Sequence, residues 1–319
     1  MKLGVMLPAK RNTQWDLMRQ LGVKYAITKA APQLTGLNDP SDFESLKKVC
    51  DDFRDAGFTL YGLEGDEFDM DRIKLGLDGR DNDLKKYCRM LENMGRLGIK
   101  MICYNFMGGV GWYRTRTDLP ERGGALTSGF DIYDAEKVPS KNTAEKMWEN
   151  YEYFLRAVLP TAEKAGVKMC LHPDDPPIPE LMGYSRIIIS ADAYRRAMSL
   201  SDSPSHGITF CQACFNVMGE DVFSLIEEFG ERIFFLHFRD TTGNREHFRE
   251  TFHDNGPTDM AKLMELASKF APNCIVRPDH TPSMAGESNE SNTGYAVLGN
   301  IFAVGYIKGI CDGGKINLE

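Results

Sequence analysis

Four apolar segments of the sequence each run directly into a residue type that binds metal ions. They end at His172, Cys211, His237 and Asp279, and the last of these is followed by His280. Two imidazoles, a thiolate and a carboxylate form a plausible ligand set for one divalent ion. If the four segments are strands that end at one face of a sheet, the sequence predicts a metal site at that face.

Each of these residues also has a simpler explanation. A single histidine after a strand is more often hydrogen-bonded in a loop, and a buried cysteine usually fills space in the core. Cys211 and Cys214 also form one Cys-x-x-Cys pair, a spacing found in redox and zinc sites. We favour the joint metal site because the simpler explanations would all have to hold at the same end of neighbouring strands.

Strand-like and helix-like segments alternate along the whole chain. The expected strands are 3–7, 25–28, 59–63, 100–104, 167–171, 207–210, 233–236 and 274–276. The expected helices are 13–21, 41–56, 83–97, 142–165, 191–200, 221–229, 259–270 and 295–310, with a cap at Ser41 and a kink or break at Pro160. Eight such units predict an α/β fold, a closed (β/α)8 TIM barrel that places all strand ends on one face.

The chain of 319 residues is expected to form a single barrel domain over 1–319. The segment 107–141 interrupts the alternation, and its glycines, aromatic residues and arginines favour an irregular loop on the active face that contacts substrate. No Gly-x-Gly-x-x-Gly follows the first strand, so a dinucleotide-binding fold has no support.

Composition argues against nucleic-acid-binding and membrane proteins. The formal net charge of −8 argues against a nucleic-acid binder. No apolar run reaches the roughly 18 residues of a membrane span, so no membrane association is expected. The eight cysteines are sparse and irregularly spaced, which favours reduced thiols and a cytoplasmic location.

The motifs around these residues resemble the mannonate dehydratase family, a branch of the xylose-isomerase-like barrels. The matching segments are Cys103-Tyr104-Asn105-Phe106-Met107, Arg116-Thr117-Asp118-Leu119, His172-Pro173-Asp174-Asp175-Pro176-Pro177, Thr209-Phe210-Cys211, His237-Phe238-Arg239, His253-Asp254-Asn255-Gly256, Arg277-Pro278-Asp279-His280 and Gly294-Tyr295. The resemblance covers most of the chain in the right order. It departs after His280, where Thr281-Pro282-Ser283 replaces the Gly-His that family members commonly carry.

The resemblance implies a lyase of hexuronate catabolism that dehydrates D-mannonate to 2-keto-3-deoxy-D-gluconate. It implies that His172, Cys211, His237 and Asp279 hold a divalent ion, manganese first, with iron, cobalt or zinc as alternatives. It also implies self-association and a catalytic pair, His280 and Tyr295. We expect Tyr295 to be the base, which requires a lowered pKa, and His280 to be the acid.

Several further residues are candidates for contact with the sugar acid. Arg239 and Arg277 are expected either to hold a substrate carboxylate or to form structural ion pairs. Asn105, Trp112 and His253 are expected on the active face, whereas His206 and His247 are expected at the surface. Asp174, Asp175 and Asp240 are expected either to orient the ligating imidazoles or to be solvated loop carboxylates.

Two other functions remain open at this point. One is a metal-dependent sugar isomerase or epimerase on the same barrel, for which Glu64 would be a spare carboxylate ligand. The other is a binding protein for sugar acids that has no catalytic activity. The thiolate of Cys211 favours dehydration over isomerisation, and product analysis would separate all three.

Overall fold

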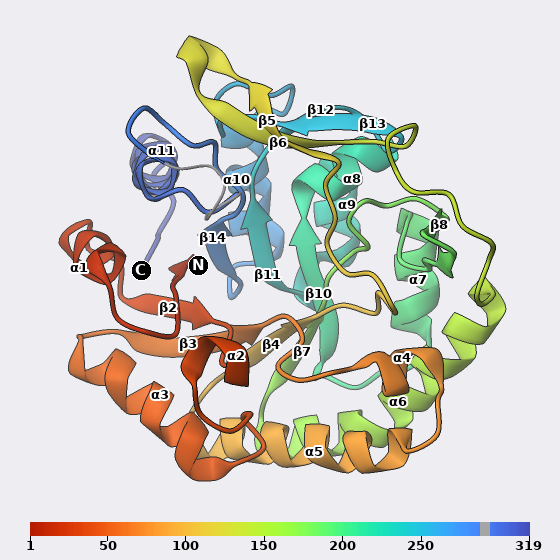
Figure 1. The fold of residues 1–319 in the computed structure, drawn as a ribbon. Helices are drawn as coiled ribbons and strands as arrows, with labels where there is room; N and C mark the ends of the chain where they lie inside the picture. Colours follow the sequence, from red (N-terminus) through yellow and green to blue (C-terminus); the bar gives the residue numbers. More distant parts are fainter. Residues whose placement is uncertain (288–293) are drawn as a thin grey trace.

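Eight parallel strands close into a barrel in the computed structural model, which describes residues 1–287 and 294–319 (Figure 1). The order around the ring is β1, β14, β11, β10, β7, β4, β3, β2. The strands are β1 (Lys2–Met6), β2 (Tyr25–Thr28), β3 (Thr59–Glu64), β4 (Met101–Tyr104), β7 (Lys168–Leu171), β10 (His206–Cys211), β11 (Ile233–Phe238) and β14 (Ile275–Pro278). The predicted (β/α)8 barrel is therefore confirmed.

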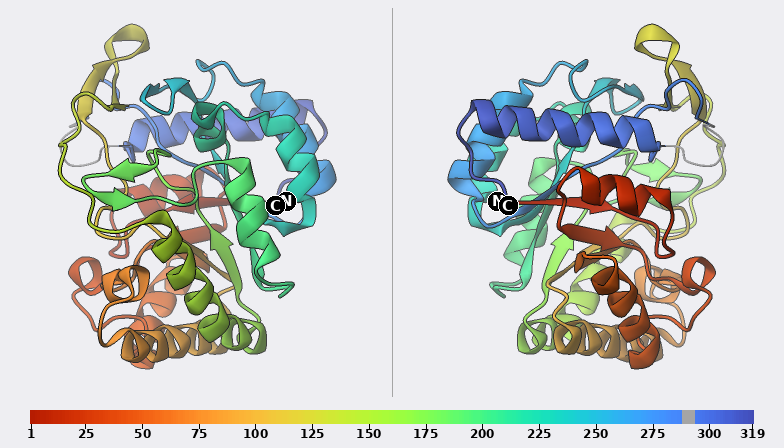
Figure 2. Two further views of the ribbon diagram at one scale, coloured as in Figure 1. Left: turned by 90° about the vertical axis from the view of Figure 1, so that its right-hand side faces the viewer. Right: turned by 90° about the vertical axis from the view of Figure 1, so that its left-hand side faces the viewer.

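Helices surround the barrel (Figures 1 and 2). The longer ones are α1 (Thr13–Gln20), α3 (Phe43–Asp55), α5 (Arg80–Leu97), α6 (Ala144–Ala165), α7 (Ala191–Ser199), α9 (Val222–Phe229), α10 (Met260–Phe270) and α11 (Val297–Gly313). Shorter helices are α2 (Pro32–Thr35), α4 (Asp71–Leu75) and α8 (Gln212–Met218). Within the described part of the chain, no helix combines the length and the apolar character that crossing a membrane requires.

Local sequence explains where these helices begin and which face they bury. Asp42, and not the expected Ser41, caps α3, because its carboxylate accepts a hydrogen bond from the backbone NH of Ser45 at 2.9 Å. Leu46, Val49 and Phe53 of α3 are buried at helical spacing against the barrel. The expected break at Pro160 does not occur, since α6 runs through that residue as one helix.

The segment 107–141 is not the irregular loop that was predicted. It contains β5 (Arg116–Pro120) and β6 (Leu126–Asp131), and β6 pairs with β13 (His247–Glu250) from the segment after β11. With β12 (Thr241–Asn244) they form an antiparallel sheet in the order β12, β13, β6, β5, across the top of Figure 1. Phe130 and Phe248 pack across it with ring centroids 5.9 Å apart. We call these four strands the mouth sheet.

Candidate active site

The four predicted ligands lie together at the carboxyl ends of neighbouring strands. His172 follows β7, Cys211 is the last residue of β10, His237 lies near the end of β11, and Asp279 follows β14. Ligand atoms of Cys211, His237 and Asp279 all lie within 4.8 Å of one another, as do those of His172, Cys211 and Cys214. The imidazole rings of His172 and His237 are 4.9 Å apart between centroids.

The chemistry of these groups fits a divalent cation. Both ring nitrogens of His237 are buried and have no hydrogen-bond partner among the described residues. Each lies 3.4 Å from a carboxylate oxygen, one from Glu64 and one from Asp279. Burial and Arg277 act to lower the pKa of His237, but the two carboxylates outweigh them and raise it well above its ordinary value. The site therefore attracts positive charge at the position where a metal would bind.

Among the four proposed ligands, Cys211 can supply a second negative charge beside that of Asp279. Burial alone would raise its pKa, but a hydrogen bond from Cys214 and the charge of Arg239 lower it well below its ordinary value. The guanidinium of Arg239 lies 3.3 Å from the sulfur of Cys211 and 3.1 Å from that of Cys214. Cys211 is thereby prepared as a thiolate ligand, whereas the pKa of Cys214 is raised by burial and by Cys211 itself.

Arg239 lies in a buried network of charges and does not line the cavity beside the proposed metal site. Its Nη1 donates to Glu250 at 2.7 Å, and its Nη2 donates to Asp175 at 2.7 Å. Arg114 contacts the same two carboxylates, with 2.6 Å between Nη1 and Asp175 Oδ1. Asp175 and Glu250 are each shared by two guanidinium groups, and this sharing holds the pKa of Glu250 at about 2 in spite of its burial. In this structure Arg239 forms the structural ion pair that was one of its two expected roles.

Arg277 is likewise held in buried ion pairs. It donates from Nε to Glu64 at 3.0 Å and lies 2.9 Å from Asp279 Oδ1 through Nη1. Burial would raise the pKa of Glu64, but Arg277 and His237 lower it to about 2. Arg277 therefore fixes the orientation of Asp279 and of Glu64, the spare carboxylate considered for an isomerase.

His280 and Tyr295 face each other beside Asp279, with ring centroids 5.3 Å apart. Trp112 contacts the other side of His280 at 5.2 Å between centroids. The backbone NH of Thr281 donates to the carbonyl of Gly294 at 2.8 Å, so the segment that departs from the family pattern helps to hold Tyr295 in place. Burial raises the pKa of Tyr295, although the charge of Arg277 opposes the effect, so the lowered pKa expected of a base depends on a further nearby cation.

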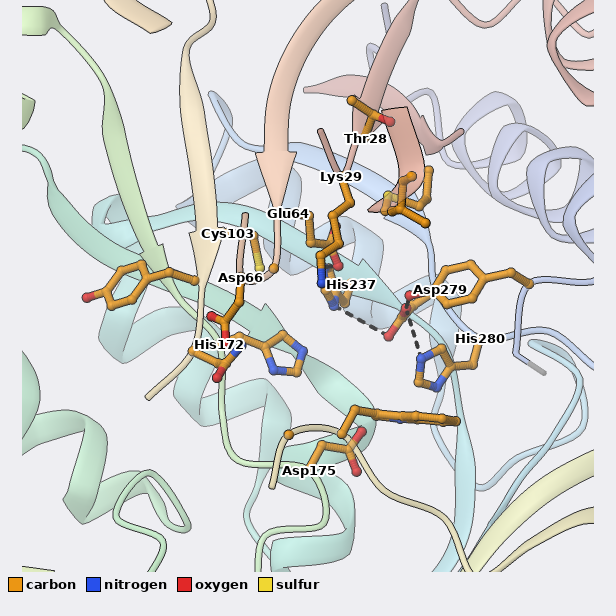
Figure 3. A pocket seen from close by; sticks show the side chains of 18 of the residues that line it. Thr28, Lys29, Glu64, Asp66, Cys103, His172, Asp175, His237, Asp279 and His280 are labelled. Carbon is orange, nitrogen blue, oxygen red and sulfur yellow. Dashed lines mark hydrogen bonds and ion pairs between the residues drawn. The ribbon is translucent and has the colours of Figure 1, made fainter. Parts of the chain in front are cut away.

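These groups border a cavity of about 480 Å³ (Figure 3). The predicted residues that line it are Asn105, Trp112, His172, His237, Asp279, His280 and Tyr295. Arg239, Arg277 and Cys211 lie behind its wall. His253 does not line it either, because its ring is fully buried, stacks on Phe238 and is hydrogen-bonded to the Phe238 carbonyl at 2.7 Å.

Some expected supporting roles are wrong. Asp174 accepts hydrogen bonds from the backbone NH groups of Ile187 and Ile188, and Asp240 accepts from Gln212 and Thr258, so neither orients an imidazole. Asp175 holds the two arginines, as described above. His206 is buried and contacts the carbonyl of Ala197, whereas His247 is exposed as predicted.

The sequence did not point to Glu250, and it suggested substrate contact for the loop that carries Arg114 and not the buried ion pairs that Arg114 forms. Glu250 lies in a polar stretch of the mouth sheet, where nothing in the local pattern marks a fully buried carboxylate. In the structure, burial alternates along β13 and places Phe248 and Glu250 on its inner face.

Comparison with known proteins agrees with this geometry. A profile of the D-mannonate dehydratase family matches residues 9–144 and 137–317, which together span most of the chain. The chain belongs to the D-mannonate dehydratase family. It is 32% identical over 314 residues to a mannonate dehydratase of Enterococcus faecalis, with 86% of each chain covered. It is 31% identical over 339 residues to one from Brachyspira hyodysenteriae, with 92% of each covered.

Solved structures agree with the family assignment. The crystal structure of mannonate dehydratase from Streptococcus suis serotype 2 superposes with a TM-score of 0.89 at 28% identity, over 98% of this chain and 93% of that one. D-Psicose 3-epimerase from Clostridium cellulolyticum H10 shares the fold alone, with a TM-score of 0.63 at 14% identity, 97% of this chain and 99% of that one being covered. The predicted family and the xylose-isomerase-like barrel are both confirmed.

Proposed function

We propose that this member of the family is a metal-dependent hydro-lyase that converts D-mannonate to 2-keto-3-deoxy-D-gluconate and water. One observation carries the proposal: three of the four proposed metal ligands, His172, His237 and Asp279, line the same cavity as the pair His280 and Tyr295. The printed names of the relatives support the substrate. Eight free thiols support a cytoplasmic location. The proposed substrate would place the enzyme in hexuronate catabolism.

His172, Cys211, His237 and Asp279 would hold the metal, for which manganese is our first choice. When bound, a divalent ion stabilises the negative charge that develops on the carboxylate side of the substrate as a proton leaves C2. Arg239 and Arg277 keep the thiolate and Asp279 charged and in place before the metal arrives.

In the reaction, the C2–H bond and the C3–O bond both break. A base takes the C2 proton, an acid protonates the departing 3-hydroxyl, and water leaves. The resulting enol then becomes the 2-keto acid by moving one proton to C3. We assign Tyr295 as the base and His280 as the acid. His280 is held at Nδ1, which lies 2.6 Å from Arg239 Nη1 and 2.9 Å from Glu250 Oε1.

The test is turnover of a panel of aldonates by the purified protein, together with elemental analysis of the bound metal. We expect a 2-keto acid from D-mannonate and about one metal ion per chain. Interconversion of aldoses and ketoses without loss of water would favour the isomerase instead. Bound metal with no turnover of any aldonate would favour a binding protein.

A further inference from the structure

The cavity is rich in negative charge, although its proposed substrate is an anion. Glu64, Asp66, Asp175 and Asp279 all line it. Two negative ligands, the Cys211 thiolate and the Asp279 carboxylate, would already balance the charge of a divalent ion. The substrate carboxylate therefore needs a further cation. Arg239 and Arg277, first considered for this role, lie behind the cavity wall and are paired with Asp175 and Glu64.

Lys29 is the only lysine or arginine among the described residues that line this cavity. It follows directly after β2, whose end is on the same face of the barrel as the metal ligands. Figure 3 shows its side chain extending into the cavity on the side of Glu64 and His237. The aliphatic part lies over Gly65, where an added Cβ would be 3.6 Å from Lys29 Cδ.

The acids around Lys29 either pair with other cations or are fully buried. Glu64 binds Arg277, and Asp66 forms an ion pair of 2.7 Å with Lys74. Glu67 is fully buried, accepts a hydrogen bond from the backbone NH of Ala30 at 2.7 Å, and has its pKa raised well above its ordinary value by burial despite the charge of Lys29. No hydrogen bond or ion pair joins the Lys29 ammonium to any residue of the described chain, so its charge is available to a ligand.

We propose that Lys29 binds the carboxylate of the aldonate and makes the cavity selective for sugar acids over neutral sugars. The inference rests on the proposed function, because it takes the substrate to be a sugar acid. The ammonium would contact the carboxylate from the β2 side while the metal ligands face it from the other. A charge-assisted contact of this kind contributes about a 10-fold or larger difference in affinity.

The test uses three variants of the metal-loaded protein. Lys29→Met removes the charge, Lys29→Arg keeps it, and Lys24→Met removes the same charge from an exposed position just before the other end of β2. We would measure kcat and KM for D-mannonate, inhibition by D-gluconate and by uncharged D-mannitol, and D-gluconate binding by calorimetry.

For Lys29→Met we expect KM and the D-gluconate Kd to rise about 10-fold or more, with D-mannitol inhibition unchanged. Lys29→Arg should recover most of the loss, and Lys24→Met should match the wild type. Unchanged KM and Kd in Lys29→Met, or an equal loss for the charged and uncharged ligands, would overturn the inference. Absence of D-mannonate turnover in the wild type would instead refute the proposed function, and the calorimetric comparison would still decide the role of Lys29.

Discussion

The guanidinium of Arg239 contacts three carboxylates, an imidazole and two sulfur atoms at once. Its hydrogen bonds reach Glu250 at 2.7 Å, His280 at 2.6 Å and Cys211 at 3.3 Å. One side chain thus lowers the pKa of Cys211, a proposed metal ligand, and contacts the imidazole of the proposed acid. A lysine would keep the charge but lose the planar set of donors, so the two residues are not equivalent here.

Two substitutions separate the proposed acid from the proposed base. For D-mannonate labelled with deuterium at C2, His280→Asn should lose about 10²-fold or more in kcat while still exchanging the label with water, because only protonation of the leaving group is lost. Tyr295→Phe should lose both dehydration and exchange. Mass spectrometry of recovered substrate and metal analysis of each variant provide the measurement. Full activity of metal-loaded His280→Asn would show that the assignment is wrong, and the opposite exchange pattern would interchange the two roles.

At the level of single residues, the grouping of the four proposed metal ligands could be predicted because each lies at or just after the end of an apolar strand. The acidic partners of Arg114 and Arg277 could not be predicted. Glu250 lies 136 positions from Arg114, and Glu64 lies 213 positions from Arg277. Whether an arginine faces substrate or an acid depends on such distant segments, which one sequence does not bring together.

The mouth sheet is the element that sequence patterns failed to predict. β5 and β6 contain Pro120 and Gly129, which are uncommon within strands, and the partner strand β13 begins more than 100 residues later. Its pairing depends on tertiary contacts and not on a local turn signal. The barrel strands were easier to identify because burial on both faces makes each a short apolar run.

Arg114 joins the start of the mouth sheet to the barrel. Replacing it with Met should lower the free energy of unfolding by about 3–5 kcal/mol, because Asp175 and Glu250 would stay buried with one cation fewer. Urea denaturation of the metal-free protein measures the effect. Arg116→Met is the matched control on β5, since its ion pair with Asp118 is exposed and should matter little. Equal stability of the two variants would contradict the importance of the buried pairs.

At the scale of the whole molecule, the site makes the metal-free protein sensitive to acid. The pKa values of Glu64 and Glu250 are about 2 in the folded state, against an ordinary value of 4.5. Between these values the unfolded chain binds more protons than the folded one, so stability falls as pH falls. We expect the urea midpoint to drop steadily from about pH 5 toward pH 2. A constant midpoint across this window would show that these carboxylates contribute no stability.

The mouth sheet links segments that we expect to unfold locally together. β6 contributes backbone hydrogen bonds to both β5 and β13, and Leu126 also pairs with Ser283 in the segment that leads to Tyr295. Segments from three distant parts of the chain therefore form one hydrogen-bonded unit beside the cavity. Local unfolding of any one of them breaks bonds of the others, so their amide protons should exchange with solvent at similar rates, as a cooperative unit.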